Sequence, residues 1–151
     1  MNYQRIIQQI VEQARELKDI STTENKARVN YACIFSQSKK EYKELETDVA
    51  QYGKLIKETK MGNVYLVEPI QTWSGLVKIV KIRKPDPERP ERGDADFTVR
   101  DYKVFKKEYL DKPGFSLIER PDMEMIELAD PNFNVLAYFS NPTLGEVLGI
   151  N

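Results

Sequence analysis

The sequence predicts an α+β protein made of two βαβββ modules that form paired, curved, mixed sheets around a cleft, preceded by an N-terminal amphipathic helix. Two observations lead to this fold. A strand-like run, one helical pattern and three further strand-like runs occur in that order twice along the chain. Gly53 and Gly114 mark the same point in the two halves: Gly53 stands where a C′ glycine belongs, and Gly114 belongs to the segment 112–114 that stops the second helix. The halves share few letters, so the repeat is one of elements.

The first twenty residues indicate an amphipathic helix, and the segment 21–25 (STTEN) that follows indicates a turn. Together, residues 1–25 form the N-terminal extension. Its apolar side chains recur at helical spacing: Ile6, Ile7, Ile10, Val11, Ala14 and Leu17. We expect this face to pack on the sheets. The alternative is contact with a second copy of the chain, which makes a homodimer a possible partner state.

The first module spans residues 26–83. Its first strand is expected at 29–35 (VNYACIF), a β-branched and aromatic run. Ser38 and Glu41 match a capping box that opens a helix. The helix would present one apolar face, made of Tyr42, Leu45, Val49 and Tyr52. Three more strands are expected at 54–59, 63–68 and 76–83.

Residues 84–93 (KPDPERPERG) are rich in proline and charge and predict a solvated linker loop without regular structure. The second module then spans 94–140. Asp101 is placed to cap a helix that carries Tyr102, Phe105 and Tyr109 on one face. The strands of this module are expected at 94–99, 115–119, 123–129 and 135–139. Residues 141–151 predict a tail, either a loop or a short closing helix.

Length and composition suit one soluble domain. The chain has 151 residues, 40% of them hydrophobic and 31% charged, with a net charge of −1. This balance gives no reason to expect binding to nucleic acid or to a membrane surface. The polar N-terminus does not indicate a signal peptide, and a single cysteine suits a reducing compartment, so we expect a cytoplasmic protein.

The chain contains no histidine, which removes the commonest metal ligand and the commonest general base near neutral pH. Cys33 is the only cysteine, so it can form neither a thiolate metal site nor a Cys–His pair. Any catalysis would rest on Asp, Glu, Lys, Tyr or Cys. We therefore predict no cofactor, and a divalent metal would need carboxylate ligands.

The paired βαβββ order resembles the vicinal-oxygen-chelate superfamily, which includes glyoxalases, bleomycin-resistance proteins and dioxygenases. The segment 130–135 (DPNFNV) is similar to the DP-x-G-N turn before the last strand of many members, with Phe133 in the place of the glycine. The middle of the chain, PIQTWSGLVKIVKIRKPDPERPERGDADFTV, resembles the YecM-like branch, which also carries an N-terminal helical extension.

This resemblance implies four metal-ligand positions, which project into the cleft from the first and last strands of the modules. The first-strand ligand falls near Tyr31, and the glutamate of the fourth strand falls near Lys81. The fifth-strand histidine falls at Asp94, and the last-strand glutamate falls near Leu136 or Ala137. Of these four positions, only Asp94 keeps a plausible metal donor.

Strand alternation places Asp94 and Asp96 on the face opposite Ala95, Phe97 and Val99, toward the cleft. Two carboxyls this close raise each other's pKa when desolvated, and they could bind a cation or serve as acid and base. A solvated strand start is the simpler interpretation. Lys81 could neutralise one of them in the place of a metal, or it could be an ordinary solvent-facing lysine.

Aromatic side chains complete the predicted cleft. Tyr31, Cys33 and Phe35 share one face of their strand, and Tyr138 lies near them if the modules pair as in the superfamily. They could line a pocket for a small ligand or simply fill it as core, with Cys33 as a small buried hydrophobe. Trp73 lies between two strands, where we expect it to cap the core; gating a pocket is the alternative.

Three classes of function are compatible with this sequence. The favoured one is a metal-independent module that binds or sequesters a small molecule, with a candidate site made of Tyr31, Cys33, Lys81, Asp94, Asp96 and Tyr138. The second is a metal-dependent lyase, isomerase or dioxygenase of glyoxalase type with carboxylate ligands. The third is a non-catalytic interaction domain whose cleft is filled by side chains.

Overall fold

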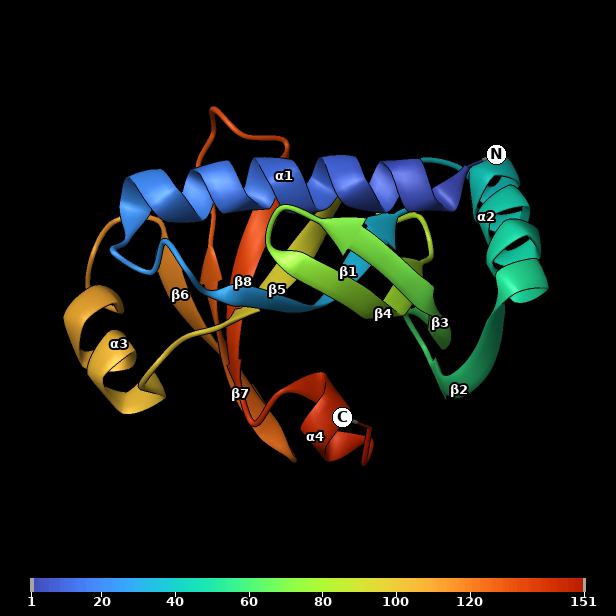
Figure 1. Ribbon diagram of the computed structural model, residues 1–151. Helices are drawn as coiled ribbons and strands as arrows, with labels where there is room; N and C mark the ends of the chain where they lie inside the picture. Colours follow the sequence, from blue (N-terminus) through green and yellow to red (C-terminus); the bar gives the residue numbers. More distant parts are fainter. Residues whose placement is uncertain (1, 151) are drawn as a thin grey trace.

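A mixed eight-stranded sheet forms the centre of the protein in the computed structural model, which describes residues 2–150 (Figure 1). The helices are α1 (Tyr3–Ser21), α2 (Lys39–Tyr52), α3 (Tyr102–Tyr109) and α4 (Leu144–Val147). The strands are β1 (Arg28–Phe35), β2 (Gly53–Thr59), β3 (Gly62–Thr72), β4 (Gly75–Arg83), β5 (Gly93–Thr98), β6 (Phe115–Arg120), β7 (Met123–Leu128) and β8 (Val135–Asn141). The predicted α+β class and order of elements are confirmed.

The two modules repeat the same strand arrangement and join edge to edge. The strand order is β2-β3-β4-β1-β5-β8-β7-β6. In each half the first strand pairs in parallel with the last, β1 with β4 and β5 with β8. The two halves meet where β1 pairs antiparallel with β5. The paired curved sheets of the sequence prediction are therefore one continuous sheet with its seam at β1 and β5.

Gly93 explains how closely the strands meet at this seam. A Cβ atom at this position would lie 2.1 Å from the carbonyl oxygen of Cys33 and 2.7 Å from Cδ1 of Ile10. No side chain fits there, so the position requires glycine. The predicted linker at 84–93 is thus one residue too long, because Gly93 already pairs with Ile34 and with Val135 as the first residue of β5.

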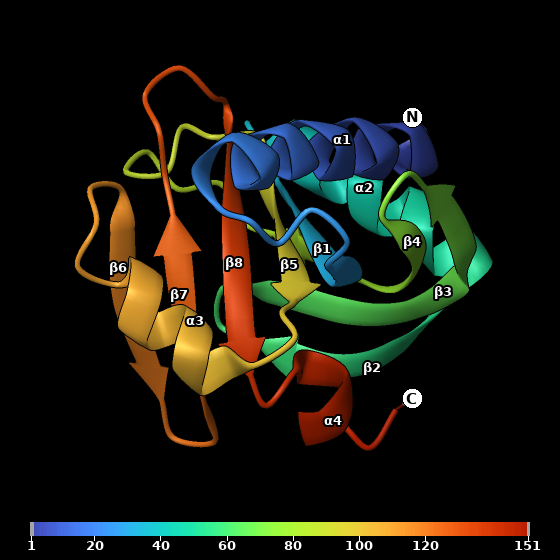
Figure 2. The same ribbon diagram turned by 60° about the vertical axis from the view of Figure 1, so that its left-hand side comes forward.

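Helix α1 lies across the sheet and packs on both halves (Figures 1 and 2). Its predicted apolar face is buried except for Ile6, which is partly buried, and two residues outside the prediction, Tyr3 and Lys18, are buried as well. The helix forms one core cluster with the sheet, α2 and α3. The expected packing of this face on the sheet is therefore confirmed, and a homodimer stays a prediction.

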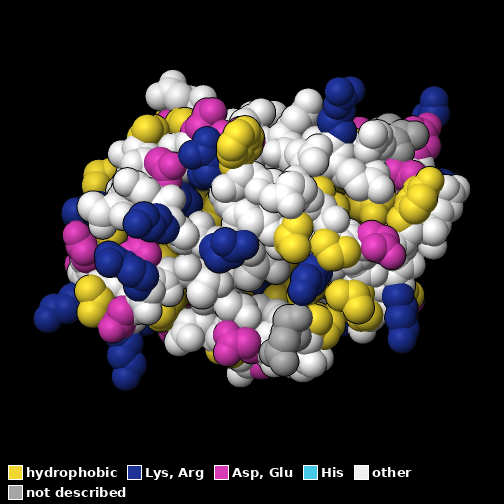
Figure 3. Space-filling view, in the orientation of Figure 1, with side chains coloured by type: hydrophobic (Ala, Val, Ile, Leu, Met, Phe, Trp, Pro, Cys, Tyr) yellow, Lys and Arg dark blue, Asp and Glu magenta, His cyan; other side chains and the backbone are white. Residues whose placement is uncertain are grey.

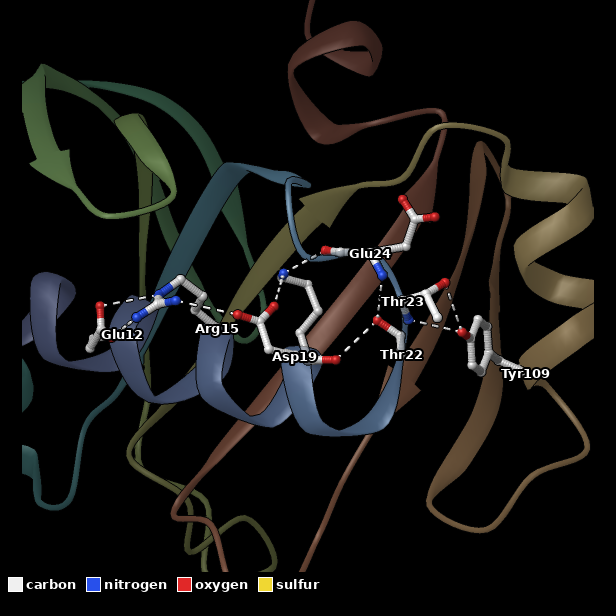
Figure 4. Close-up of polar contacts among 8 residues, drawn as sticks. Glu12, Arg15, Asp19, Thr22, Thr23, Glu24 and Tyr109 are labelled. Atoms are coloured by element: carbon white, nitrogen blue, oxygen red, sulfur yellow. Dashed lines mark hydrogen bonds and ion pairs between the residues drawn. The ribbon is translucent and has the colours of Figure 1, made fainter.

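Lys18 is a charged residue inside this core, with no exposed surface. Its Nζ donates to Oδ1 of Asp19 at 2.5 Å and to the carbonyl of Glu24 at 2.6 Å, so the ammonium group is paired. Nearby, the backbone N–H of Thr23 donates to the hydroxyl of Tyr109 at 3.0 Å and ties the end of α1 to α3 (Figure 4). This network is structural, because it lies on the helix-covered face of the sheet.

Two details of α2 differ from the sequence prediction. The Ser38 hydroxyl caps the helix by accepting from the N–H of Glu41 at 3.0 Å, but Glu41 does not return the bond to Ser38. Its carboxylate instead accepts from the N–H of Gln37 and pairs with Arg92. Gly53 is not a left-handed C′ glycine, since its φ is −143°. It is glycine because a Cβ would lie 2.8 Å from Cγ1 of Val67.

The prediction for Trp73 is wrong. This side chain neither caps the core nor gates the cleft: it is 85% exposed at the turn between β3 and β4. The β3 strand continues to Thr72, well beyond the expected end at residue 68, and carries the turn away from the core. By contrast, the prediction for Asp101 is confirmed, because its carboxylate accepts from the N–H of Val104 at the start of α3.

The surface mixes both signs of charge. On the face seen in Figure 3, basic and acidic side chains are interspersed, and hydrophobic side chains gather on its right-hand part. Within residues 2–150, no helix is long and apolar enough to cross a membrane.

Candidate functional site

A cavity of about 600 Å³ lies between the two modules. It opens on the face of the sheet that α1, α2 and α3 leave uncovered, which we call the inner face. Both modules line it, through their strands and through the β2–β3 and β6–β7 turns. The C-terminal helix α4 lies on this side too (Figure 2), and its Leu144 reaches the cavity wall.

The inner face is largely apolar and aromatic. Its buried cluster consists of Tyr31, Cys33, Phe35, Val64, Ile79, Met125, Leu136 and Tyr138. Alternation along each strand divides the residues between the two faces: on β8, Leu136 and Tyr138 face inward, whereas Ala137 and Phe139 belong to the helix-covered core. Of the two positions considered for the last-strand ligand, only Leu136 is therefore on the inner face.

Five of the six predicted site residues line the cavity: Tyr31, Cys33, Lys81, Asp94 and Tyr138. The sixth, Asp96, faces the same side but has no exposed surface and lies beneath the cavity wall. The prediction that Asp94 and Asp96 point away from Ala95 and Phe97 is confirmed, since the latter two belong to the helix-covered core. Neither aspartate is solvated: Asp94 is 3% exposed and Asp96 0%.

Cross-strand pairing arranges cavity residues in one row, which runs from Lys57 at the rim across the floor. Lys57 pairs with Val64, Val64 with Lys81, Lys81 with Cys33, and Cys33 with Asp94. Neighbours in such a row point to the same face. Neighbouring strands lie about 4.8 Å apart, so the Cα atoms of Lys81 and Asp94, with Cys33 between them, are about 10 Å apart. Polar and apolar groups thus alternate across the floor.

Asp94 is a buried carboxyl without a hydrogen-bond partner among residues 2–150, and its Oδ1 is fully enclosed. Burial raises its pKa to about 8, and the nearby Asp96 contributes to the rise. Lys81 and Arg83 act in the opposite direction but do not offset the burial. At neutral pH the protonated form of Asp94 is therefore favoured, and its O–H is available to donate to a group in the cavity.

Asp96 is the contrasting case. Its Oδ1 accepts from the side chain of Asn30 at 3.1 Å, from the Ser140 hydroxyl at 2.9 Å and from the Ser140 N–H at 3.2 Å. Burial raises its pKa to about 6, and these hydrogen bonds limit the rise. Because Asn30 lies on β1 and Ser140 on β8, these bonds to Asp96 tie β1, β5 and β8 together. Its position and bonds indicate a structural role.

Lys81 lies in the cavity wall but does not neutralise either aspartate by direct contact. No ion pair joins it to another residue within the described part of the chain, 2–150. Lys81 therefore stands at a metal-ligand position, as expected, but it does not replace the metal by pairing with an aspartate. Cys33 lies between Lys81 and Asp94 in the row and keeps the ammonium and the carboxyl apart. The Lys81 ammonium remains available to a ligand.

The remaining predicted residues form the aromatic end of the floor. Burial raises the pKa of Tyr31, Cys33 and Tyr138 well above their usual ranges, and Asp94 adds to each shift. The Cys33 thiol is therefore not activated, as expected for a small buried hydrophobe. The Tyr138 hydroxyl donates to Oε2 of Glu127 at 3.1 Å, so its orientation is fixed.

The sequence missed several basic residues of this site. Arg89 lines the cavity and pairs with Glu127 at 3.2 Å, although the charged linker was expected to be solvated only. Lys57, Lys60 and Arg120 reach the rim from β2, from the β2–β3 turn and from the end of β6. The repeat of the two modules could have predicted these rim residues, because it places the β2–β3 and β6–β7 turns at the mouth of one cleft.

The four metal-ligand positions of the superfamily do not fit a metal ion in this chain. Tyr31, Lys81, Asp94 and Leu136 are a neutral phenol, an ammonium, a carboxyl and a hydrocarbon. An ammonium repels a divalent cation, and one carboxyl is too few donors for a protein metal site. Within residues 2–150, no group of three or more carboxylate or thiol side chains is placed to hold an ion.

Comparisons with known proteins support the fold. No family model matches the sequence, and no curated protein does. Among solved structures, the chain is similar to "Structural Genomics, Protein EC4020", with a TM-score of 0.71 at 14% identity over 97% of this chain and 91% of that one. At this identity the likeness concerns the fold alone, and it extends over α1 as well as both modules.

Two further solved structures show weaker likenesses. One is a glyoxalase/bleomycin resistance protein/dioxygenase superfamily member from Vibrio splendidus 12B01, at 11% identity and a TM-score of 0.48 over 76% of this chain and 97% of that one. The other is an extradiol ring-cleaving dioxygenase from B. fuscum, at 16% identity and a TM-score of 0.43. That likeness covers 74% of this chain and 31% of the dioxygenase chain. The observed order of elements is the paired βαβββ arrangement on which the resemblance to the vicinal-oxygen-chelate superfamily was based. The YecM-like branch stays a prediction.

Proposed function

We propose that this protein binds a small organic molecule in the cavity between its two modules, without a bound metal ion. The observation that carries the proposal is the cavity itself. A space of about 600 Å³ has room for a small organic molecule. Its floor combines aromatic and aliphatic side chains with two polar groups, Lys81 and Asp94, that have no partner within residues 2–150. A cavity that served only as core would be filled.

The donor set supports independence from metal. Of the four ligand positions, only Asp94 carries a carboxyl, and its raised pKa favours the protonated form, which is a poor ligand. Tyr31 and Asp94 offer hydrogen bonds to an organic ligand instead, and the Tyr138 hydroxyl, which donates to Glu127, can still accept one. Binding and sequestration need no further groups, whereas glyoxalase-type chemistry needs several convergent donors.

The proposal is tested by a thermal-shift screen of small organic molecules on protein treated with EDTA. A ligand at a hundredfold excess over its dissociation constant stabilises the folded state by about 2.7 kcal/mol, which raises the melting temperature measurably. We expect hits that persist in EDTA and that disappear in Val64→Trp, since the indole would fill the cavity floor. Met125→Trp serves if Val64→Trp fails to fold.

The control is the same melt with Mg²⁺, Mn²⁺, Ni²⁺ and Zn²⁺, together with elemental analysis of protein purified without chelator. The proposal predicts no bound metal and no shift. If a metal co-purifies and Asp94→Asn removes it, the claim of metal independence is wrong, and a metal-dependent enzyme becomes the favoured class of function. If no compound binds in the cavity, the interaction-domain class is favoured.

A further inference from the structure

Basic side chains are concentrated around the cavity, although the protein as a whole is not basic. The chain has 23 basic and 24 acidic residues. The cavity lining has six basic side chains and two acidic ones, Asp94 and Asp122. The basic ones are Lys57, Lys60, Lys81, Arg83, Arg89 and Arg120. This local excess contrasts with the balanced composition of the chain.

Most of this positive charge has no acidic partner within the described residues, 2–150. Arg83 pairs with Asp86 and Arg89 pairs with Glu127. The other four, Lys57, Lys60, Lys81 and Arg120, form no ion pair there. Low-dielectric walls focus the field of such charges into a cleft, which attracts an anion and orients it.

Asp94 does not cancel this field. Its buried position raises its pKa to about 8, so the carboxyl is mostly neutral at pH 7. The acidic group nearest the floor is therefore a hydrogen-bond donor rather than a competing anion. The remaining acid, Asp122, is exposed in the β6–β7 turn at the rim. Within the part of the chain that the structure describes, a ligand on the floor would face the unpaired ammonium of Lys81 beside the apolar side chains Val64 and Met125.

We propose that the ligand of this cavity is an amphipathic organic anion with an apolar body. Lys81 holds its anionic group, and Val64 and Met125 contact its apolar body. Lys57, Lys60 and Arg120 at the rim attract it toward the cavity. This inference rests on the proposed function and adds the chemical class of the ligand.

Two fluorescent probes of nearly the same shape test the inference. 8-Anilinonaphthalene-1-sulfonate is an aromatic anion, and N-phenyl-1-naphthylamine is the same skeleton without the sulfonate. We expect the anion to bind the EDTA-treated protein at least tenfold more tightly than the neutral probe, and the preference to shrink as salt screens the rim charges. Fluorescence titration gives both dissociation constants.

Two lysines of the same strand provide matched variants. Lys81→Met removes the cavity ammonium and keeps a side chain of similar length, whereas Lys78→Met removes an exposed ammonium outside the cavity. We expect Lys81→Met to weaken binding of the anionic probe at least tenfold and to leave the neutral probe unchanged. Lys78→Met should change neither. Circular dichroism and the melting temperature verify that both variants are folded.

Each outcome separates the two claims. If both probes bind equally and Val64→Trp blocks them, the ligand class is wrong while the proposed function stands. Equal weakening of the anion by Lys78→Met and Lys81→Met also overturns the ligand class, because bulk charge would then explain the effect. If neither probe binds, the ligand class is wrong, and the thermal-shift screen decides the proposed function. If binding of both probes survives Val64→Trp and Met125→Trp, the cavity is not their site and both claims fail.

Discussion

Asp94 and Asp96 are two residues apart on one strand, yet their surroundings give them different roles. Asp96 accepts three hydrogen bonds, from Asn30 and Ser140, that hold neighbouring strands together. Asp94 has no such partner within residues 2–150 and lies in the cavity wall. The alternation of the sequence predicts that both face inward, but only the tertiary structure brings Asn30 and Ser140 to one of them.

Substitution by alanine should separate these roles. Asp96→Ala leaves the Ser140 N–H and the Asn30 amide without their acceptor, so we expect a loss of about 1–3 kcal/mol in unfolding free energy at pH 7. Asp94→Ala removes a buried carboxyl that has no hydrogen bond to lose, and it should cost less than about 0.5 kcal/mol or stabilise the fold. Urea denaturation measures both; the reverse order would contradict the assignment.

The raised pKa of Asp94 makes stability depend on pH. The folded protein keeps the proton up to about pH 8, whereas the unfolded chain releases it near pH 4. Between these values the folded state binds more protons, so unfolding free energy falls as pH rises. Asp96 adds a similar decline that ends near pH 6. We expect Asp94→Asn to reduce the loss between pH 5 and pH 9 by roughly 2–4 kcal/mol.

Denaturation of both proteins at several pH values checks this expectation. Other charged groups around Asp94 are common to the two proteins: Asp96, Lys81, Arg83 and Glu127, with the phenols of Tyr31 and Tyr138. Their contributions therefore largely cancel in the difference. Parallel pH profiles for wild type and Asp94→Asn would show that Asp94 is ionised in the folded state throughout, against the expectation.

Among the elements, the pairing of β1 with β5 decides whether the modules form one sheet. The Gly93 position has no room for a side chain because the Cys33 carbonyl lies where a Cβ would be. Gly93→Ala should therefore force the two strands apart and cost about 1–3 kcal/mol or more. Ser116→Ala, on the exposed edge strand β6, should change stability by less than about 0.5 kcal/mol.

Thermal or urea melts of the two variants provide the measurement. If Gly93→Ala is as stable as Ser116→Ala, then β1 and β5 lie farther apart at Gly93 than described here, and the cavity floor would be arranged differently. The dependence is direct, because Asp94 and Cys33 meet across this same pairing. The pairing of β1 with β5 thus determines both the join between the modules and the shape of the cavity floor.

Local sequence signals predicted most elements, and they failed where a distant partner intervened. The Ser38 cap and the Asp101 cap depend on neighbours three residues away, and both form. Glu41 was expected to complete a capping box, but Arg92, fifty-one residues along the chain, draws its carboxylate away. Gly53 was expected to be left-handed, but close contact with Val67 is what requires it.

At the scale of the whole molecule, the repeat of elements predicted the fold and the position of the cleft. It could not predict the charge of the cleft. Lys57, Arg89 and Arg120 come from three separate segments, and only the folded chain brings them to one cavity. Nor could it predict that Trp73 would be exposed, because the length of the β3–β4 hairpin depends on pairing rather than on local preference.

The most direct test of the account is to locate the binding of 8-anilinonaphthalene-1-sulfonate by NMR on isotope-labelled, EDTA-treated protein. We predict that the amide signals that shift most belong to the cavity row, above all Val64, Lys81, Cys33 and Asp94. These residues come from four strands and both modules, so such a pattern has no other simple source. Shifts confined to the exposed surface around Trp73, or spread evenly over the protein, would contradict the central claim that this cavity is the binding site.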